Sequence, residues 1–389
     1  MNGRIKRLQQ LLREKEIDGA VYATSACMQY LLDDVSWHWQ RTMYCGGLPD
    51  MWPEGLAGHF LNNPDRMLYV PAEGEPFLAV TYAAEEDMRH LPIETEAGYF
   101  HRLMDIMSPR LRGKRIALGE ACRPYLKAML EEFAPQAAWT DGEQMVLSMR
   151  MVKDEKEIAA LRRAARFTDE ATEKTVEILR PGVTKGEVEA YLAQLGRDAG
   201  LRDVSFPPAA LFVKTGSGMT LGSDTADMKL TEGTAIAFDF GYVLDGYCSD
   251  YGRSFYCGKA PSFYAEGYRA LQKAQTELLK RIRPGIPVDL CRRVLEETLD
   301  ACGGYARYLR KHPVSGLMGH QIGIDVHEHP WVHDAQSQVF EPGMVMCIEP
   351  KLWFENVGYM RVEDMVLITE DGCESLTSFD RNLFELPAD

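Results

Sequence analysis

Two aspartates interrupt an aromatic and apolar stretch, AIAFDFGYVLDGYCSDYGRSF, that begins at Ala235. The dipeptide Asp245-Gly246 is a strong signal for a two-residue hairpin loop, so the stretch predicts two antiparallel strands. Asp239 then falls inside the first strand and Asp250 inside the second. Because a carboxylate buried without a partner is costly, this pair constrains both the fold and the chemistry of the chain.

The hairpin fixes which residues face each other. A two-residue loop pairs Leu244 with Tyr247. In that register Asp250 lies opposite Gly241, and Gly241 shares a face with Asp239, two residues earlier. The two carboxylates are then diagonal neighbours, with backbones roughly 7–8 Å apart. Such a pair requires a cation, which can be lysine, arginine or a metal; the alternative is two structural aspartates that accept bonds from backbone amides.

Three further polar residues interrupt strand-like sequence downstream. His320 lies in GLMGHQIGIDVHEHP, Glu349 in GMVMCIEPKLWF and Glu363 in GYMRVEDMVLIT. The last two segments predict a second hairpin centred at Asn356, in which Glu349 and Glu363 face each other. Four carboxylates and one imidazole on predicted strands form a set that is too anionic to bury without cations.

This ligand set predicts a metal centre. Carboxylate and imidazole ligands suit divalent manganese, cobalt, zinc or iron, and the absence of a thiolate from the set favours the harder ions. Five ligands, several of them able to bridge, indicate two ions about 3.5–4 Å apart that share a water or hydroxide. We therefore expect two divalent ions, manganese first, at Asp239, Asp250, His320, Glu349 and Glu363.

In this order the five residues resemble the ligands of the pita-bread metallopeptidases: Xaa-Pro aminopeptidases, prolidases and methionine aminopeptidases, with creatinase as a metal-free relative. The motifs FDFG, GHxIGxxxHExP, IEP and RVEDMVLIT match as well. IDGAVYAT, PAEGEPFLAV and the linker MRMVKDEKEIAALRRAA extend the resemblance to the creatinase and prolidase branch. It implies an α/β fold: a small creatinase-like domain at residues 1–153 and a pita-bread catalytic domain, a duplicated antiparallel sheet with outer helices, at residues 154–389.

The resemblance also implies roles for individual residues. Two ligands would bridge both ions and three would bind one ion each: Asp250 and Glu363 bridge, Asp239 binds one ion, and His320 and Glu349 bind the other. Glu349 matches the general base of the peptidases. His327 matches the histidine that contacts the scissile group and steadies the tetrahedral intermediate. Arg361 would orient Glu363 or hold a substrate carboxylate.

Two departures from the family pattern lie on the substrate side. Family peptidases carry a histidine on the strand before the first metal aspartate, where this chain has Gly222. The aminopeptidase branch has another histidine four residues before the metal histidine, where this chain has Gly316. Ser223, Asp224 and His38 are candidates to replace these groups.

Three functions stay open. The first is an Xaa-Pro peptidase of the aminopeptidase P or prolidase type that uses a hydroxide shared by two metal ions. The second is a hydrolase or lyase that acts on a non-peptide small molecule at the same site, as the two glycines suggest. The third is an inactive binding protein, which is the weakest because no metal ligand is missing.

The second half of the chain contains a short internal sequence repeat. The segment Arg180–Val183 reads RPGV, and Arg283–Ile286 reads RPGI. Each is preceded and followed by helical sequence, so each predicts a turn between two helices. The repeat suggests that the second domain consists of two related halves.

Composition limits partners and location. A formal net charge of -15 argues against nucleic acid and anionic membranes as partners. No stretch resembles a membrane span or secretory signal, and the nine cysteines lack CxxC spacing, so we expect reduced thiols and a cytoplasmic protein. The substrate is expected to be a small molecule or short peptide. The creatinase and prolidase branch implies a homodimer, with the Trp-rich segment Trp37–Phe60 as a candidate lid or recognition loop.

Overall fold

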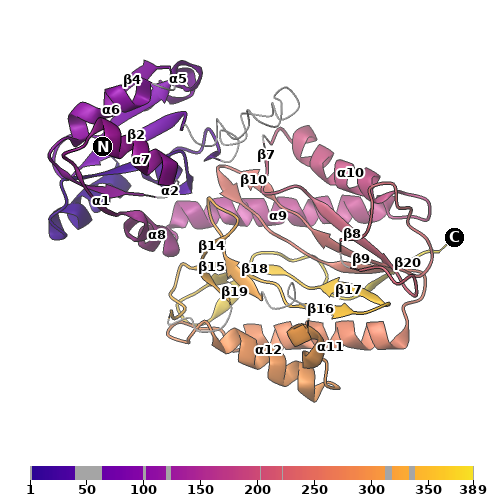
Figure 1. Cartoon of the computed structure of the whole chain (residues 1–389). Helices are drawn as coiled ribbons and strands as arrows, with labels where there is room; N and C mark the ends of the chain where they lie inside the picture. The colour runs from indigo at the N-terminus through magenta and orange to yellow at the C-terminus, as the bar shows by residue number, and fades with distance from the viewer. Residues whose placement is uncertain are drawn as a thin grey trace. The chain divides into compact units, whose positions relative to one another are not determined.

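The computed structural model of the chain describes residues 2–39, 64–99, 102–119, 124–201, 203–220, 222–311, 318–332 and 338–388. Most of the predicted Trp37–Phe60 loop, from residue 40 onward, lies outside the described residues, as does Gly316. The chain divides into two compact units, Met1–Arg150 and Met151–Asp389 (Figure 1).

The first unit is built on a mixed sheet with the strand order β4-β3-β2-β1-β5-β6. The central strand β1 pairs antiparallel with β2 and parallel with β5. The strands are β1 (Gly19–Ala23), β2 (Arg66–Pro71), β3 (Phe77–Thr81), β4 (Glu94–Gly98), β5 (Arg115–Leu118) and β6 (Ala138–Asp141). The helices are α1 (Gly3–Glu14), α2 (Ala26–Leu32), α5 (Tyr82–Met88), α6 (Leu103–Leu111), α7 (Pro124–Phe133) and α8 (Glu143–Met151). The expected α/β fold of this part of the chain is confirmed.

The second unit contains mainly antiparallel sheets between long helices, with one parallel pair, β12 and β20. The sheet orders are β11-β10-β7, β20-β12-β9-β8, β14-β13-β15-β18-β19 and β16-β17. The helices are α9 (Glu155–Ile178), α10 (Lys185–Asp198), α11 (Ser262–Leu279), α12 (Leu290–Ala301) and α13 (Ala306–Lys311). The strands are β7 (Asp203–Val204), β8 (Ala209–Lys214), β9 (Thr234–Asp239), β10 (Tyr242–Leu244), β11 (Tyr247–Cys248), β12 (Ser254–Cys257), β13 (Gly319–Gln321), β14 (Glu328–Trp331), β15 (Val345–Ile348), β16 (Lys351–Phe354), β17 (Gly358–Arg361), β18 (Asp364–Ile368), β19 (Cys373–Ser375) and β20 (Phe384–Leu386).

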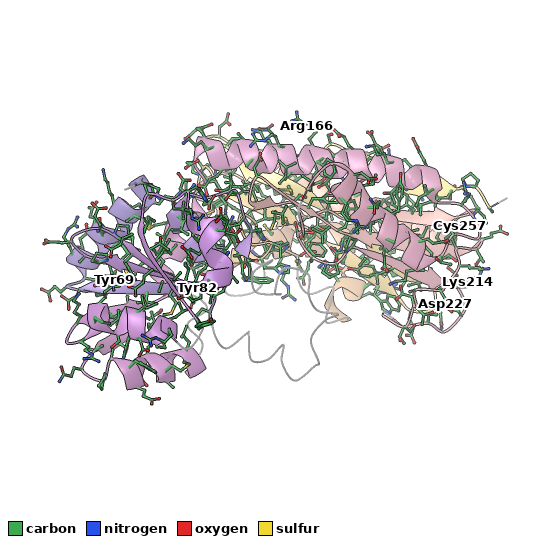
Figure 2. The ribbon with its side chains drawn as sticks, turned by 90° about the horizontal axis from the view of Figure 1, so that it is seen from above. Tyr69, Tyr82, Arg166, Lys214, Asp227 and Cys257 are labelled. Atoms are coloured by element: carbon green, nitrogen blue, oxygen red, sulfur yellow. The ribbon has the colours of Figure 1, made fainter. Side chains whose placement is uncertain are left out.

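Helices form the outer layers of this unit. One apolar core lies between α11 and α12 and the strands β15 to β18, and another lies between α9 and α10 and the strands β8 and β9 (Figure 1). On α9 the buried Leu161 and Ala164 face the sheet, whereas Arg166 is exposed (Figure 2). This spacing is that of an amphipathic helix with one face in the core. The predicted arrangement of sheets inside outer helices is confirmed.

The helical segment around residue 153 is interrupted. α8 ends at Met151, and Asp154 is the N-cap of α9, with an extended backbone at φ -78 and ψ 171. The Asp154 side chain accepts bonds from the first turn, and Glu157 reaches back to the Asp154 amide at 2.9 Å. This capping box begins a new helix within the linker MRMVKDEKEIAALRRAA.

The register of the first predicted hairpin is confirmed. Leu244 faces Tyr247, and Phe240 forms a bridge with Tyr251 in the same register. Asp245 and Gly246 have φ values of 51 and 76. Two consecutive positive φ values are what a two-residue hairpin loop with the correct twist requires.

The second predicted hairpin is confirmed as well. Lys351 faces Arg361 on β16 and β17, and the same register continues through β15 and β18. Glu349 and Glu363 lie between these paired segments, so the two carboxylates face each other as expected. Asn356, at the centre of the loop, has a φ of 59.

The two copies of the Arg-Pro-Gly repeat have similar structures. Gly182 and Gly285 have φ values of 96 and 80, which glycine adopts without strain. The Gly182 amide donates to the Leu230 carbonyl at 2.8 Å, and the Gly285 amide donates to the Phe340 carbonyl at 2.9 Å. Both turns therefore join two helices and bond the same way to a later segment, which supports two related halves.

Candidate functional site

The five predicted metal ligands come from strand ends in the second unit. Four of them are buried, and the Asp239 side chain is 28% exposed. Asp239 ends β9, Asp250 lies between β11 and β12, His320 is on β13, Glu349 follows β15, and Glu363 precedes β18.

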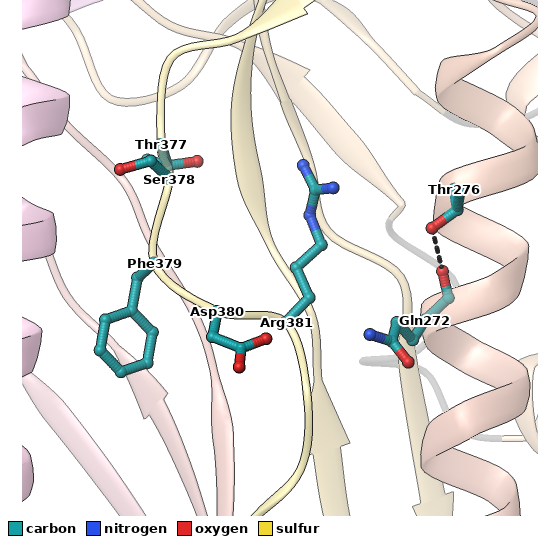
Figure 3. A pocket seen from close by; sticks show the side chains of 7 residues that line it. All are labelled: Gln272, Thr276, Thr377, Ser378, Phe379, Asp380 and Arg381. Atoms are coloured by element: carbon teal, nitrogen blue, oxygen red, sulfur yellow. Dashed lines mark hydrogen bonds between the residues drawn. The ribbon is translucent and has the colours of Figure 1, made fainter.

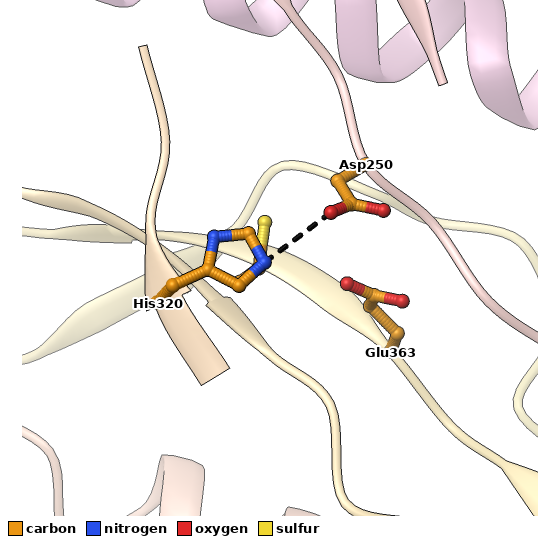
Figure 4. Close-up of side chains that lie close together, drawn as sticks. Asp250, His320 and Glu363 are labelled. Carbon is orange, nitrogen blue, oxygen red and sulfur yellow. Dashed lines mark ion pairs between the residues drawn. The ribbon is translucent and has the colours of Figure 1, made fainter. Parts of the chain in front are cut away.

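Three of these ligands converge on one point. Donor atoms of Asp250, His320 and Glu363, together with the Cys347 thiol, all lie within 4.8 Å of one another (Figure 4). His320 Nε2 is 3.3 Å from Asp250 Oδ2. The structure therefore brings together the core of the predicted set.

The other two predicted ligands lie outside this tight group because each is held by a cation. Asp239 Oδ2 is 2.5 Å from Arg361 Nη1. Glu349 Oε2 is 2.5 Å from Lys351 Nζ, while its other oxygen, Oε1, is 3.7 Å from His320 Nε2. Glu349 thus faces the group with one oxygen only.

Arg361 contacts several carboxylates at once. Besides its pair with Asp239, its Nη1 lies 3.3 Å from Glu363 Oε2 and its Nη2 lies 3.7 Å from Glu349 Oε2. The Arg361 side chain is only 6% exposed. This geometry suits the predicted role of orienting Glu363, and it extends that role to two other carboxylates.

The inner carboxylates need a cation. Burial, reinforced by the charges of Asp239 and Glu349, raises the pKa of Asp250 well above its usual value. Burial and the charge of Asp250 do the same to the pKa of Glu363. Among the described residues, Asp250 Oδ1 and Glu363 Oε1 are buried without a hydrogen-bond partner. A divalent ion would satisfy both oxygens and stabilise both ionised forms, so the donor set fits a metal.

The histidine and the outer glutamate are in the charge states that ligands need. Burial lowers the pKa of His320, so its imidazole is neutral and has a free electron pair for a metal. Burial alone would raise the pKa of Glu349, but the charges of Lys351, Arg361 and His320 outweigh it and lower that pKa. Burial opposes the charged form of Lys351, but the Glu349 carboxylate raises the lysine pKa above its usual value.

Two side chains of the site were missed in the sequence. Cys347 is on β15, two residues before Glu349, and strand alternation places it on the same face. Lys351 begins β16 and is 3% exposed. The same alternation that located the carboxylates could have found Cys347, and a lysine within an apolar hairpin strand is the signal for Lys351. Burial raises the pKa of the Cys347 thiol well above its usual value, so this side chain is a neutral thiol within the group.

His327 lies beside the group and faces solvent. Its ring centroid is 4.5 Å from that of His320, and the ring stacks on Trp331 at 5.1 Å. The side chain is exposed, in the segment between β13 and β14. The structure therefore places an exposed imidazole next to the buried donor atoms.

The candidate substitutes on the substrate side have local roles. Ser223 donates to the Thr220 carbonyl at 2.7 Å, and the Asp224 carboxylate accepts a bond from the Phe212 amide at 3.1 Å. Gly222 has a φ of 78, and a Cβ there would meet no atom within 4 Å. A histidine at this position would have space but a strained backbone. His38 belongs to the first unit.

A separate surface pocket lies at the C-terminal segment. Its volume is about 340 Å³, and it is lined by Gln272, Thr276, Thr377, Ser378, Phe379, Asp380 and Arg381 (Figure 3). Arg381 Nε is 2.6 Å from the buried Asp364, and Asp380 accepts a bond from the Asn382 amide at 2.9 Å. The charged groups of this pocket therefore serve the local structure.

Across the described segments, no helix has the length and apolar character that a membrane crossing requires.

The fold agrees with that of known proteins. The prolidase of Pyrococcus horikoshii is 22% identical, with a TM-score of 0.81 and coverage of 98% of this chain and 100% of that chain. The Xaa-Pro dipeptidase of Bacillus anthracis is 21% identical, with a TM-score of 0.81 and coverage of 98% and 99%. These likenesses show the shared pita-bread fold.

Sequence relatives point the same way. An uncharacterized peptidase of Staphylococcus haemolyticus is 30% identical over 329 residues, which cover 82% of this chain and 86% of that protein. An uncharacterized peptidase of Staphylococcus aureus is 30% identical over 246 residues, which span 62% of this chain and 66% of that protein. Residues 159–370 match the model of metallopeptidase family M24, a segment that holds all five predicted ligands. This chain therefore belongs to metallopeptidase family M24.

Proposed function

We propose that this protein is a metal-dependent hydrolase that cleaves Xaa-Pro peptides, in the manner of an aminopeptidase P or a prolidase. One observation carries the proposal: Asp250, His320 and Glu363 converge with unpartnered carboxylate oxygens beside an exposed His327. The printed activities of the solved proteins with this fold, a prolidase and an Xaa-Pro dipeptidase, support the choice of substrate.

The predicted ligand set has room for up to two divalent ions, with manganese as the first expectation. Bound there, such ions would act as a Lewis acid and lower the pKa of a water molecule to about 7. Asp250, Glu363 and His320 would hold the metal, and Asp239 and Glu349 would complete its coordination.

The remaining steps belong to side chains of this chain. Glu349 would accept the proton of the attacking water at Oε1, because its Oε2 is occupied by Lys351. His327 would donate a hydrogen bond to the oxygen that becomes negative as the amide is attacked. Arg361 would keep Asp239 and Glu363 in place through its contacts of 2.5 Å and 3.3 Å.

A second candidate function is hydrolysis or elimination on a non-peptide small molecule. It is favoured by Gly222, which stands where family peptidases carry a histidine, and by the local bonds of Ser223 and Asp224. Without another side chain in place of that histidine, this protein would contact a bound peptide differently from the family peptidases.

A substrate panel tests the proposal. Purified protein loaded with manganese is assayed on Xaa-Pro dipeptides, on longer peptides with proline in the second position, and on small amides without proline. We expect cleavage of at least one Xaa-Pro class and none by the Asp250→Asn variant. Turnover of the small amides alone would support the second candidate.

We also propose that the protein is a cytoplasmic homodimer whose N-terminal domain, residues 1–153, precedes the catalytic domain. The described cysteines, seven in number, are all free thiols, which suits a reducing compartment. Light scattering at micromolar concentration tests the assembly, and a monomeric mass would contradict it.

A further inference from the structure

Lys351 is a buried cation beside the candidate metal centre. Its side chain is 4% exposed, and its Nζ is 2.5 Å from Glu349 Oε2. Arg361 Nη2 lies 3.7 Å from the same oxygen. One oxygen of Glu349 therefore already faces two fixed positive charges, and only Oε1 remains for a metal.

The outer carboxylates of the centre are both neutralised by the chain itself. Asp239 has Arg361 at 2.5 Å, and Glu349 has Lys351 at 2.5 Å. Arg361 and Lys351 face each other across the hairpin of β16 and β17, so one local structure presents both cations. These two pairs carry no net charge.

The inner carboxylates have no such partner. Asp250 contacts the neutral His320 at 3.3 Å, and Glu363 shares Arg361 at 3.3 Å with the closer Asp239. Asp250 Oδ1 and Glu363 Oε1 lack hydrogen-bond partners among the described residues. When both are ionised, the inner pair carries two negative charges, which one divalent ion neutralises.

A second ion would meet a different environment. Two divalent ions would leave the buried group of four carboxylates and two cations with surplus positive charge. Uncompensated charge in a buried site is strongly unfavourable. Lys351 contributes one unit of this surplus, and without its ammonium Glu349 would offer a negative charge that its closest cation no longer neutralises.

We propose that Lys351 takes the place of a second tightly bound ion. The centre binds one divalent ion tightly between Asp250, His320 and Glu363, and a further ion binds only weakly on the side of Glu349. Lys351 is thus a positioning residue that sets the number of metal ions. The inference rests on the metal centre of the proposed function and deepens it.

The test measures metal content and affinity. Full-length protein is stripped with a chelator, reloaded with Mn²⁺, desalted and analysed by mass spectrometry for manganese per chain. We expect wild type to retain one ion and Lys351→Met to retain two. In a calorimetric titration, Lys351→Met should bind the second ion on the order of 10–100-fold more tightly than wild type, the range for groups that contact a ligand.

Two variants control for charge and for substitution itself. Lys351→Arg keeps a cation beside Glu349 and should retain one ion. Lys259→Met removes an exposed lysine that pairs with Glu385 at 2.7 Å, and it should match wild type. Circular dichroism checks that each variant is folded. If Lys351→Met does not fold, the number of manganese ions retained by Lys351→Gln and by wild type tests the inference instead.

The outcomes separate this inference from the proposed function. Two tightly bound ions in wild type, or a folded Lys351→Met or Lys351→Gln that binds the second ion no more tightly than Lys351→Arg, would overturn the inference. One retained ion with the expected gain in the variant supports it, whether or not Xaa-Pro peptides are cleaved. Failure to cleave those peptides counts against the proposed function alone.

Discussion

Lys351 and Arg361 face each other across one hairpin, and each holds a different carboxylate at 2.5 Å, Glu349 and Asp239 respectively. The pairing leaves Asp250 and Glu363 as the carboxylates that still need a cation. The hairpin therefore both completes the metal centre and divides its ligands into two kinds.

Asp250 should be indispensable for metal binding. Its carboxylate lies in the group with His320 and Glu363, and one of its oxygens has no partner among the described residues. Asp250→Ala should lose at least one bound ion while remaining folded, because removal of a buried carboxylate also relieves repulsion. Metal analysis of the desalted variant checks this, and an unchanged metal content would remove Asp250 from the ligand set.

His327 should contribute to turnover and little to folding. Its ring is exposed and touches the ligand His320, so it can reach a substrate without holding a metal. A donor aimed at developing negative charge typically contributes about 10²–10³ in rate. His327→Ala should lose about that factor in kcat with its metal content intact. His329→Ala, which removes a neighbouring exposed imidazole, is the matched control, and equal losses in the two variants would refute the role.

Gly222 separates the two candidate functions. Its φ of 78 strains any side chain, so Gly222→Ala is the control that carries the strain without an imidazole. If the protein is a peptidase that lacks one helper group, Gly222→His should exceed Gly222→Ala in kcat/KM on an Xaa-Pro dipeptide. Equal values in the two variants would favour a site rebuilt for another compound.

A buried ion pair next to the centre should dominate stability in acid. Asp364 is fully buried and lies 2.7 Å from Arg253 Nη2 and 2.6 Å from Arg381 Nε. Burial would raise the pKa of Asp364, but Arg253 and Arg381 outweigh burial and lower it. The stabilisation is therefore present above the unfolded pKa, about 3.9, and is lost as the pH falls through the lower folded value.

Urea denaturation of the metal-free protein measures this contribution. Asp364→Asn should reduce the free energy of unfolding by about 3–5 kcal/mol at pH 7, because it leaves a buried guanidinium without its partner. The gap to wild type should shrink below about pH 4. Glu374→Gln breaks the exposed pair with Arg162 and should change stability by less than about 1 kcal/mol. If the difference in the free energy of unfolding between wild type and Asp364→Asn does not change with pH, the lowered pKa of Asp364 is contradicted.

Local signals in the sequence were sufficient for both hairpins, and they singled out Asp250, His320 and Glu363, which the structure brings together. The registers of both hairpins follow from Asp245-Gly246 and from the spacing around Asn356, because turn chemistry and strand alternation act over a few residues. Local patterns could also have pointed to Cys347 and Lys351. Their distances to the carboxylates depend on how strands far apart in the sequence approach one another, which local patterns do not encode. The left-handed backbone at Gly222 was also missed, since a glycine in place of histidine was interpreted only as a lost side chain.

Metal-dependent hydrolysis of an Xaa-Pro dipeptide tests the central claim most directly. The protein is assayed after removal of metal with a chelator and again after Mn²⁺ is restored, with Asp250→Asn treated in the same way. The account predicts no cleavage without metal, recovery on addition of Mn²⁺, and no recovery in the variant. Cleavage at an undiminished rate by the metal-free protein, or full recovery in Asp250→Asn, would contradict it.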